Sequence, residues 1–187
     1  PARQLMSTRS RFVVQGVALA VLLSFASAGP ATAATVEIWY APDDFPLDRV
    51  VKLYAHAKRY IYVSVYGLTS PAVVRALVEA KKRGVDVRLI TDRERLTDPK
   101  QRTAAATLRL AGVPIRVNQH DALMHLKQTV IDDVVNASGS ANYTTSGNQY
   151  NDERLDVITD SRLTAKARDK FLAMWNDTVR FAPWEGE

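Results

Sequence analysis

The sequence contains no cysteine and only three histidines among its 187 residues. The absence of cysteine excludes disulfide bonds, thiolate metal sites and a cysteine nucleophile. Any imidazole chemistry must therefore come from His56, His120 or His125. A chain of this length can bury a real hydrophobic core without the help of disulfides.

Long hydrophobic runs are also scarce, and the most prominent one lies near the N-terminus. Residues 12–28 are almost entirely apolar, two arginines precede them, and Ala31-Thr32-Ala33 has the small-x-small pattern that signal peptidase cleaves. We therefore predict a signal peptide over residues 1–33, with residues 1–5 as an upstream extension if Met6 is the start. Cleavage before Ala34 would export residues 34–187 to the periplasm or the medium, without a stable membrane span. The competing interpretation is an uncleaved anchor, for which 17 residues is near the lower limit.

A strong excess of one charge is missing once that segment is set aside. The full chain has 25 Lys and Arg against 20 Asp and Glu. Residues 1–33 hold three arginines and no acidic residue, so residues 34–187 keep 22 basic against 20 acidic residues. The bulk charge therefore permits a nucleic-acid partner but does not argue for one.

Segments with a period of two alternate with segments of helical period along residues 34–187. Ser70 and Pro71 fit an N-cap and a first helical position, and Gly84 fits the residue that follows a helix. Strands are predicted at residues 35–41, 60–66, 85–91, 113–117 and 155–159, and helices at residues 47–58, 71–83, 99–111 and 161–179. This order predicts an α/β fold with a mixed β-sheet sandwiched between helices. Because no linker or repeat divides the segment, we expect one domain.

Residues 125–142 are predicted to form a β-hairpin with polar residues at its open end. Side chains two apart in a strand share a face, which pairs His125 with Lys127 and Ser140 with Asn142. If Asp132-Asp133 is a two-residue turn, residue i pairs with residue 265−i, and Ser140 lies opposite His125. A lysine ammonium and an asparagine amide can hold phosphate oxygens. The spacing alone thus predicts a site for a phosphate-sized anion.

The same stretch fits the pattern H-x-K-x4-D-x6-G-S-x-N. This pattern resembles the signature of the phospholipase D superfamily, the HKD phosphodiesterases, and above all its small one-motif bacterial endonucleases. The segment "SVYGLTSPAVVRALVEAKKRGVDVRLITD" is similar to the part that precedes the motif in these proteins. The resemblance extends over roughly residues 47–187 and implies a phospholipase D-like fold with a single HKD repeat.

The resemblance also implies a role for each polar residue of the hairpin region. His125 would be the nucleophile and would form a covalent phosphohistidine, while Lys127 and Asn142 would clamp the phosphate. Ser140 would support them. Glu153 matches the position at which the small nucleases carry a carboxylate that orients the imidazole.

Asp132 completes the motif, and we expect it to brace the hairpin turn rather than to touch the substrate. A second histidine is needed to protonate the leaving oxygen. The other H-x-K, at His56 and Lys58, lies on a predicted helix and lacks the downstream Asp and Gly-Ser-x-Asn. We therefore expect a two-fold homodimer that pairs His125 of each subunit in a shared active site.

The resemblance leaves two substrate classes open. One is nucleic acid, cut by a metal-independent endonuclease of broad specificity. The other is a phospholipid, hydrolysed by a phospholipase D. The loops "TDRERLTDPKQR" and "TTSGNQYNDE" are polar, which favours nucleic acid over a lipid surface. His120, Asp121 and His125 form only a weak candidate metal cluster, so we expect neither a metal nor a cofactor.

Overall fold

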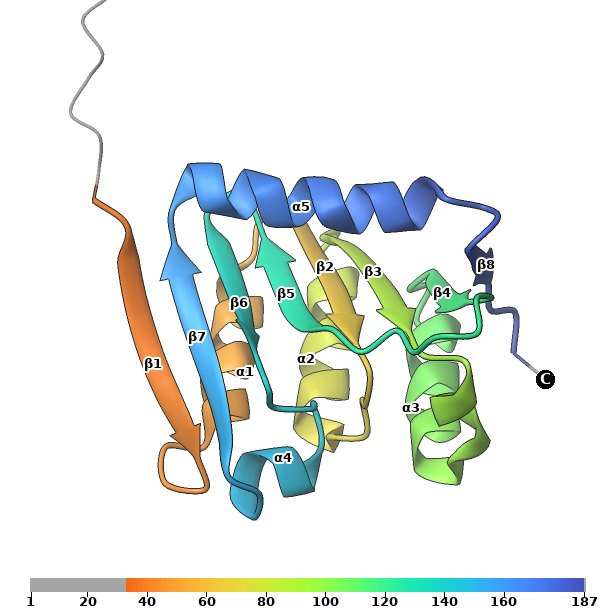
Figure 1. Ribbon diagram of the computed structural model, residues 1–187, viewed down its shortest axis with the longest axis horizontal. Coiled ribbons are helices and arrows are strands. Elements are labelled where there is room, and N and C mark those ends of the chain that lie inside the picture. Colours follow the sequence, from red (N-terminus) through yellow and green to blue (C-terminus); the bar gives the residue numbers. More distant parts are fainter. Residues whose placement is uncertain (1–32, 187) are drawn as a thin grey trace, which may run out of the picture. The chain divides into compact units, whose positions relative to one another are not determined.

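The computed structural model describes residues 33–186, so the predicted signal peptide lies outside the described residues except for its last position. The elements of the described part follow one another in the order of Figure 1. They are β1 (Thr35–Ala41), α1 (Pro46–His56), β2 (Tyr60–Val65), α2 (Pro71–Lys82), β3 (Asp86–Thr91), the 3₁₀ helix η1 (Glu94–Thr97), α3 (Pro99–Leu110), β4 (Ile115–Asn118), β5 (Lys127–Ile131), β6 (Val135–Gly139), α4 (Thr145–Gln149), β7 (Glu153–Thr159), α5 (Ser161–Asn176) and β8 (Phe181–Pro183).

The strands form one mixed sheet of eight strands in the order β1-β7-β6-β5-β2-β3-β4-β8. The central strands β2, β3 and β4 run parallel to one another, while every other neighbouring pair is antiparallel. Parallel strands need crossover connections, which α2 and α3 supply. The predicted mixed sheet is confirmed.

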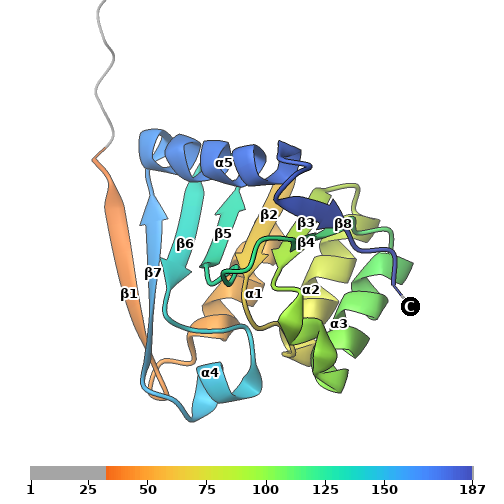
Figure 2. The same ribbon diagram turned by 45° about the vertical axis from the view of Figure 1, so that its right-hand side comes forward.

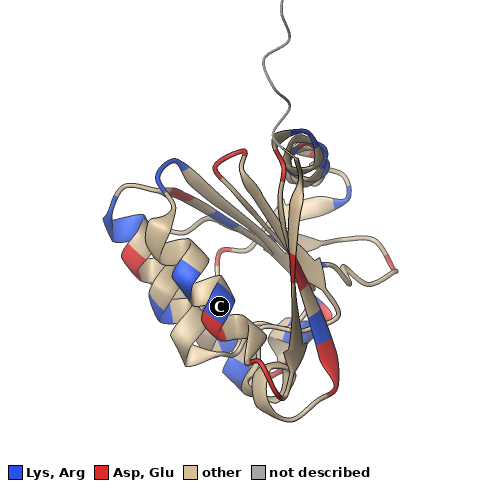
Figure 3. Ribbon diagram, turned by 90° about the vertical axis from the view of Figure 1, so that its left-hand side faces the viewer, with Lys and Arg blue, Asp and Glu red and all other residues tan. Residues whose placement is uncertain are grey.

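Helices cover both faces of the sheet. Helices α1, α2 and α3 lie on one face, and α5 crosses the other face near the ends of the strands that lie farthest from α4 (Figures 1 and 2). Seen along the edge of the sheet, α5 lies on one side and helices α1, α2 and α3 on the other, and basic and acidic residues are interspersed along the ribbon (Figure 3). β2 is buried along its whole length because helices pack on both of its faces. Within residues 33–186, no helix is both long enough and apolar enough to cross a membrane.

The ends of the helices follow local sequence signals in most places. The Ser70 hydroxyl accepts a hydrogen bond from Val73 N at the start of α2, and Gly84 follows that helix at a φ of 88°. α5 ends at Asn176, three residues earlier than expected. The Asp177 side chain accepts from the backbone N–H groups of residues 179 and 180, a local turn that competes with further helix. Elements η1, α4 and β8 were not expected from the sequence.

The hairpin has the predicted turn at Asp132 and Asp133, but the register of its strands differs from the prediction by one residue. Asp132 and Asp133 both have positive φ, and Val134 N donates to Ile131 O, as a two-residue turn requires. The strands, however, pair Ile131 with Val135, so residue i faces residue 266−i. Val134 is the extra residue of a bulge that shifts the register. The predicted alignment of Ser140 opposite His125 is therefore wrong.

Candidate active site

An open cleft of about 400 Å³ lies where four strands of the sheet begin or end. β2 and β6 end there, and β5 and β7 begin there. The lining consists of His125, Lys127, Gly139, Ser140, Asn142 and Glu153. The fold thus brings together every residue of the predicted site except Asp132.

His125 is placed at the mouth of this cleft by the residue before it. Met124 is buried against α5 in the core on that face of the sheet, and its backbone N–H donates to Asp92 Oδ2 at 2.8 Å. Asp92, which follows β3, is itself fully buried, and its Oδ1 accepts from Glu94 N at 3.0 Å. The His125 side chain is exposed, so it can meet a ligand without any rearrangement of the core.

Lys127 lies directly against the imidazole. Its Nζ is 3.1 Å from Nδ1 and 3.0 Å from Nε2 of His125, and 2.9 Å from the backbone oxygen of that residue. The lone pairs of the two ring nitrogens diverge, so at most one of the ring contacts is a directed hydrogen bond. An ammonium has three N–H groups, which leaves at least one of them for a ligand.

The surroundings of Lys127 depress its basicity. The side chain is largely buried, and this burial lowers the pKa of Lys127, while the negative charge of Glu153 acts in the opposite direction. The Tyr66 ring lies beside both reacting groups, with its centroid 4.7 Å from that of His125 and 5.2 Å from Lys127 Nζ. The imidazole and the ammonium are therefore packed against a common aromatic wall.

Asn142 is oriented by the backbone of the loop after β2. Its Oδ1 accepts a hydrogen bond from Gly67 N at 3.1 Å, and a Cβ at position 67 would lie only 3.2 Å from that oxygen. The amide oxygen is thereby occupied, so the NH2 group is the part of Asn142 that remains for a ligand. An NH2 donor next to an ammonium suits the non-bridging oxygens of a phosphate.

The residue after Asn142 anchors this loop in the core. Tyr143 is fully buried, and its hydroxyl is 2.8 Å from Thr129 Oγ1, which lies 2.7 Å from Tyr54 OH. Burial raises the pKa of Tyr143 to about 12. Tyr143 thus has a packing role, and its burial prevents its ring from stacking on a substrate.

Ser140 and Glu153 form the opposite rim of the cleft. The Ser140 hydroxyl donates to Glu153 Oε2 and accepts from Arg154 N at 3.0 Å, and Ser140 N donates to Arg154 O at 2.9 Å. Gly139 allows the two strands to approach this closely, because a Cβ there would lie 2.0 Å from Arg154 O. Within the described chain the Glu153 carboxylate therefore bonds to Ser140, not to His125.

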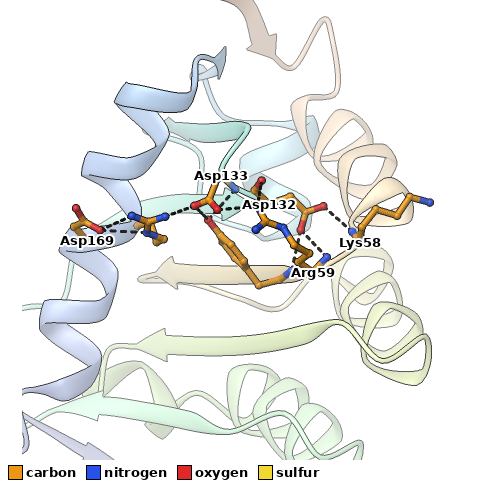
Figure 4. A network of polar contacts seen from close by, with 7 residues as sticks. Lys58, Arg59, Asp132, Asp133 and Asp169 are labelled. Atoms are coloured by element: carbon orange, nitrogen blue, oxygen red, sulfur yellow. Dashed lines mark hydrogen bonds and ion pairs between the residues drawn. The ribbon is translucent and has the colours of Figure 1, made fainter. Parts of the chain in front are cut away.

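Asp132 lies at the other end of the hairpin, away from the cleft. Its carboxylate accepts from the backbone N–H groups of Lys58, Arg59 and Tyr60 at 2.6 to 2.9 Å. The neighbouring Asp133 binds the Tyr60 hydroxyl and the Arg59 guanidinium, as part of the network in Figure 4. Asp132 thus ties the turn to the start of β2, as expected from its place in the motif.

Several residues that position the site were not found from the sequence. Tyr66 and Gly67 follow a buried strand, a place where ligands often bind, and this signal could have identified them. Gln101 in α3 gave no signal. It is 1% exposed, its amide nitrogen donates to Tyr66 O and Thr91 Oγ1, and its amide oxygen accepts from Leu68 N at 2.7 Å. It holds the loop that carries the aromatic wall. No group of three or more His, Asp or Glu residues able to hold a metal ion occurs within residues 33–186.

The fold and the cleft define a class of protein, an α/β domain whose described part holds a histidine, a lysine and an asparagine around one cleft suited to a phosphate-sized anion. Residues 50–175 match the family described as "Cardiolipin synthase, PLD-like domain". The chain belongs to the phospholipase D superfamily.

Curated relatives are about one-third identical to this chain over the residues that align. A mitochondrial cardiolipin hydrolase of Xenopus laevis is 34% identical over 145 residues, which cover 75% of this chain and 68% of the relative. That of Xenopus tropicalis is 33% identical over 135 residues, covering 72% and 63%. A phospholipase D of Rickettsia bellii is 30% identical over 120 residues, covering 64% and 56%. For these last two, the chain spans less than two thirds of the relative's length.

Solved structures confirm the fold. Nuc, a phospholipase D family member from Salmonella typhimurium, superposes with a TM-score of 0.76 at 27% identity, covering 81% of this chain and 99% of Nuc. NucT from Helicobacter pylori gives a TM-score of 0.71 at 22% identity, covering 76% and 96%. The described domain therefore has the phospholipase D-like fold predicted from the single HKD motif.

Proposed function

We propose that this protein is an exported endonuclease that hydrolyses nucleic-acid phosphodiester bonds through a covalent phosphohistidine on His125, without a metal ion. The observation that carries the proposal is the shared cleft, in which His125, Lys127 and Asn142 present an imidazole, an ammonium and an amide NH2 to the same space. These three groups are what attack on phosphorus and charge neutralisation on its oxygens require.

The reaction would proceed in two steps. In the first, a nitrogen of the neutral His125 ring attacks phosphorus, the P–N bond forms, and the P–O bond to the leaving strand breaks as a second histidine gives its proton to the leaving oxygen. In the second, water attacks phosphorus, the P–N bond breaks, and the second histidine takes the water proton. Lys127 and Asn142 stabilise the charge on the non-bridging oxygens. Glu153, held by Ser140 at the rim, is the carboxylate that we assign to orienting an imidazole.

We propose that a second copy of this chain supplies the second histidine. Val36, Ile38 and Tyr40 on β1 are 48 to 55% exposed. The strand registers place them on the same face of the sheet as α5, in a part of that face that α5 does not cover (Figure 3). Tyr40 pairs with Arg154, next to Glu153 at the rim of the cleft. An apolar strip that ends at the cleft suits a two-fold interface through which the two active sites meet.

Two observations favour nucleic acid as the substrate. The solved structure of Nuc has the same fold at 27% identity over nearly its whole chain. The polar segments 91–102 and 144–153, which carry η1, the start of α3 and α4, contribute to the hollow that adjoins the cleft at Asn142. Another observation favours a second candidate, a phospholipid. Leu123 and Leu126 are 47% and 38% exposed and line an apolar pocket of about 180 Å³ together with His125, and the curated relatives include cardiolipin hydrolases.

The test compares substrates and variants in the presence of EDTA. The protein is assayed on plasmid DNA, RNA and phosphatidylcholine or cardiolipin vesicles, beside His125→Ala and the matched control His56→Ala. We expect nucleic-acid cleavage that EDTA does not affect, that His125→Ala abolishes, and that His56→Ala leaves intact because His56 is exposed at the end of α1. Complete loss of activity in EDTA would overturn the metal-free step, and full activity of His125→Ala would overturn the nucleophile. Exclusive hydrolysis of the vesicles would establish the second candidate.

The proposed export and dimer have their own measurements. The N-terminus of the protein recovered from the periplasm or medium should be Ala34; a retained N-terminal segment in the membrane fraction would establish the anchor instead. Light scattering should show a dimer, and an active monomer would refute the shared site.

A further inference from the structure

Two hollows continue the active-site cleft along the surface of the same subunit. The nearer one has a volume of about 390 Å³ and shares Asn142 with the cleft. The farther one has a volume of about 680 Å³ and shares Thr69, Lys100, Thr144 and Ser146 with the nearer one. The three spaces therefore adjoin one another and form a groove that leads from His125 past Asn142 to the starts of α2, α3 and α4.

The lining of this groove is rich in hydroxyl groups and cations. Lys100 lies in both hollows and Arg75 in the farther one, and neither forms an ion pair within the described part of the chain. The hydroxyl groups of Thr103 and Thr107 in the farther hollow donate to backbone carbonyls of α3, so the hydroxyl donors left for a ligand come from four other residues of its lining: Thr69, Thr144, Thr145 and Ser146. In the lining of the two hollows outside the cleft, the carboxylate belongs to Asp98, which is neutralised by Arg95 at 3.1 Å. Unpaired cations and hydroxyl donors suit a ligand with repeated negative charges.

The aromatic side chain in the nearer hollow is not available for base stacking. The ring of Tyr66 is contacted by the Arg95 guanidinium at 5.5 Å, by Lys127 Nζ at 5.2 Å and by the His125 ring at 4.7 Å. Proteins that hold the bases of single strands do so mainly by aromatic stacking. This groove therefore offers contacts for the sugar–phosphate backbone but no aromatic ring on which a base can stack.

We propose that the groove binds the sugar–phosphate backbone of a single nucleic-acid strand next to the scissile phosphate, with Lys100 and Arg75 contacting successive phosphates. The inference rests on the proposed nuclease function and deepens it by naming the form of the substrate. A volume of about 680 Å³ is that of a site for a drug-sized ligand, which accommodates a short run of one strand but not a duplex. Backbone contacts without base contacts make cleavage independent of sequence.

The test measures kcat/KM on two substrates, one long enough to extend along the groove and one that fills only the cleft. The first is a single-stranded oligonucleotide of about 20 nucleotides, and the second is bis(4-nitrophenyl) phosphate, a small phosphodiester that occupies only the cleft. The variants are Lys100→Ala and Arg75→Ala, with Lys52→Ala as the matched control, since Lys52 is exposed on α1 and lines none of these spaces. Salt is varied for every protein.

We expect each groove variant to lower the ratio of oligonucleotide to small-ester kcat/KM roughly 3- to 10-fold, as the loss of one phosphate contact implies. The slope of log kcat/KM against log salt should flatten by about 0.7 for each contact removed from a single strand. Lys52→Ala should match the unmodified protein. Unchanged ratios and slopes in both groove variants, with nuclease activity present, would overturn the groove assignment alone. A protein that hydrolyses the small ester and lipid vesicles but no nucleic acid would overturn the nuclease proposal itself.

Discussion

The substitution Gly139→Ala tests whether the close approach of β6 and β7 builds the rim of the cleft. A Cβ at position 139 would lie 2.0 Å from Arg154 O, whereas ordinary contact begins near 3.4 Å. The carbonyl, which accepts from Ser140 N, would have to move by about 1.4 Å. Overpacking costs about 1–3 kcal/mol, and a weakened backbone hydrogen bond costs about 1 kcal/mol more. We therefore expect the free energy of unfolding to fall by about 2–4 kcal/mol.

The same movement should also damage catalysis, because it displaces the residues that hold Glu153. A displacement on the order of 1 Å can cost about 100-fold in rate. Thermal unfolding followed by circular dichroism should show Tm lower by roughly 5–15 °C. Hydrolysis of bis(4-nitrophenyl) phosphate, corrected for the folded fraction, should fall by one to two orders of magnitude.

Gly84→Ala is the matched control for this substitution. Gly84 has a φ of 88°, and no atom lies within 4 Å of the place that an added methyl group would take, so alanine there adds backbone strain but no clash. It should cost about 1 kcal/mol of stability and leave kcat unchanged. A Gly139→Ala protein with the stability and kcat of the Gly84→Ala control would refute the reasoning.

Three further predictions concern buried and charged groups. Tyr143→Phe removes the hydroxyl next to Thr129, so the free energy of unfolding should fall by about 1–2 kcal/mol in urea titrations; no change would contradict the buried network. Hydrogen bonds from Tyr60, Arg59 and Arg168 lower the pKa of Asp133. The ionised carboxylate therefore adds to the free energy of unfolding above the unfolded-state pKa, and this stabilisation is lost as the pH falls through the folded-state pKa. Asp133→Asn should therefore destabilise the protein at neutral pH and much less near about pH 3; an equal loss at both would contradict this. Because burial lowers the pKa of Lys127, the alkaline limb of kcat/KM should begin below the usual lysine range and should disappear from the residual activity of Lys127→Arg; a limb retained in that variant would have another origin.

Much of the site could be predicted because its residues are close in sequence and lie on a hairpin. His125 and Lys127 are two residues apart, and an extended backbone puts such side chains on the same side, where the structure has them in contact. Ser140 and Asn142 come back to the same end because the hairpin reverses at Asp132. Local geometry therefore determined which groups would meet.

The register could not be predicted because apolar patterning does not distinguish neighbouring valines. Val134 and Val135 are both β-branched and apolar, so either could face Ile131. The structure makes Val134 the bulged residue. A bulge is decided by how the turn packs on β2 and α5, and this is tertiary information.

Long-range partners were the other limit of the sequence. The sequence did not predict that Ser140 would hold the Glu153 carboxylate, across the gap that Gly139 leaves open. Gln101, which braces the loop after β2, comes from α3, a helix that contributes no residue to the lining of the cleft. Such contacts depend on how elements distant in sequence pack, and neither periodicity nor spacing contains that information.

The closed end of the hairpin is structural and the open end forms the cleft. This difference explains why Asp132 belongs to the motif although it does not line the cleft. At the closed end, Asp132 accepts hydrogen bonds from three backbone N–H groups. Asp133 binds the side chains of Tyr60 on β2 and Arg168 on α5 (Figure 4). These bonds fix the hairpin in the sheet. At the open end, His125 is left exposed and Lys127 keeps N–H groups for a ligand. A reactive end can stay open to substrate and still be precise, because the other end of the same two strands is held by the rest of the fold.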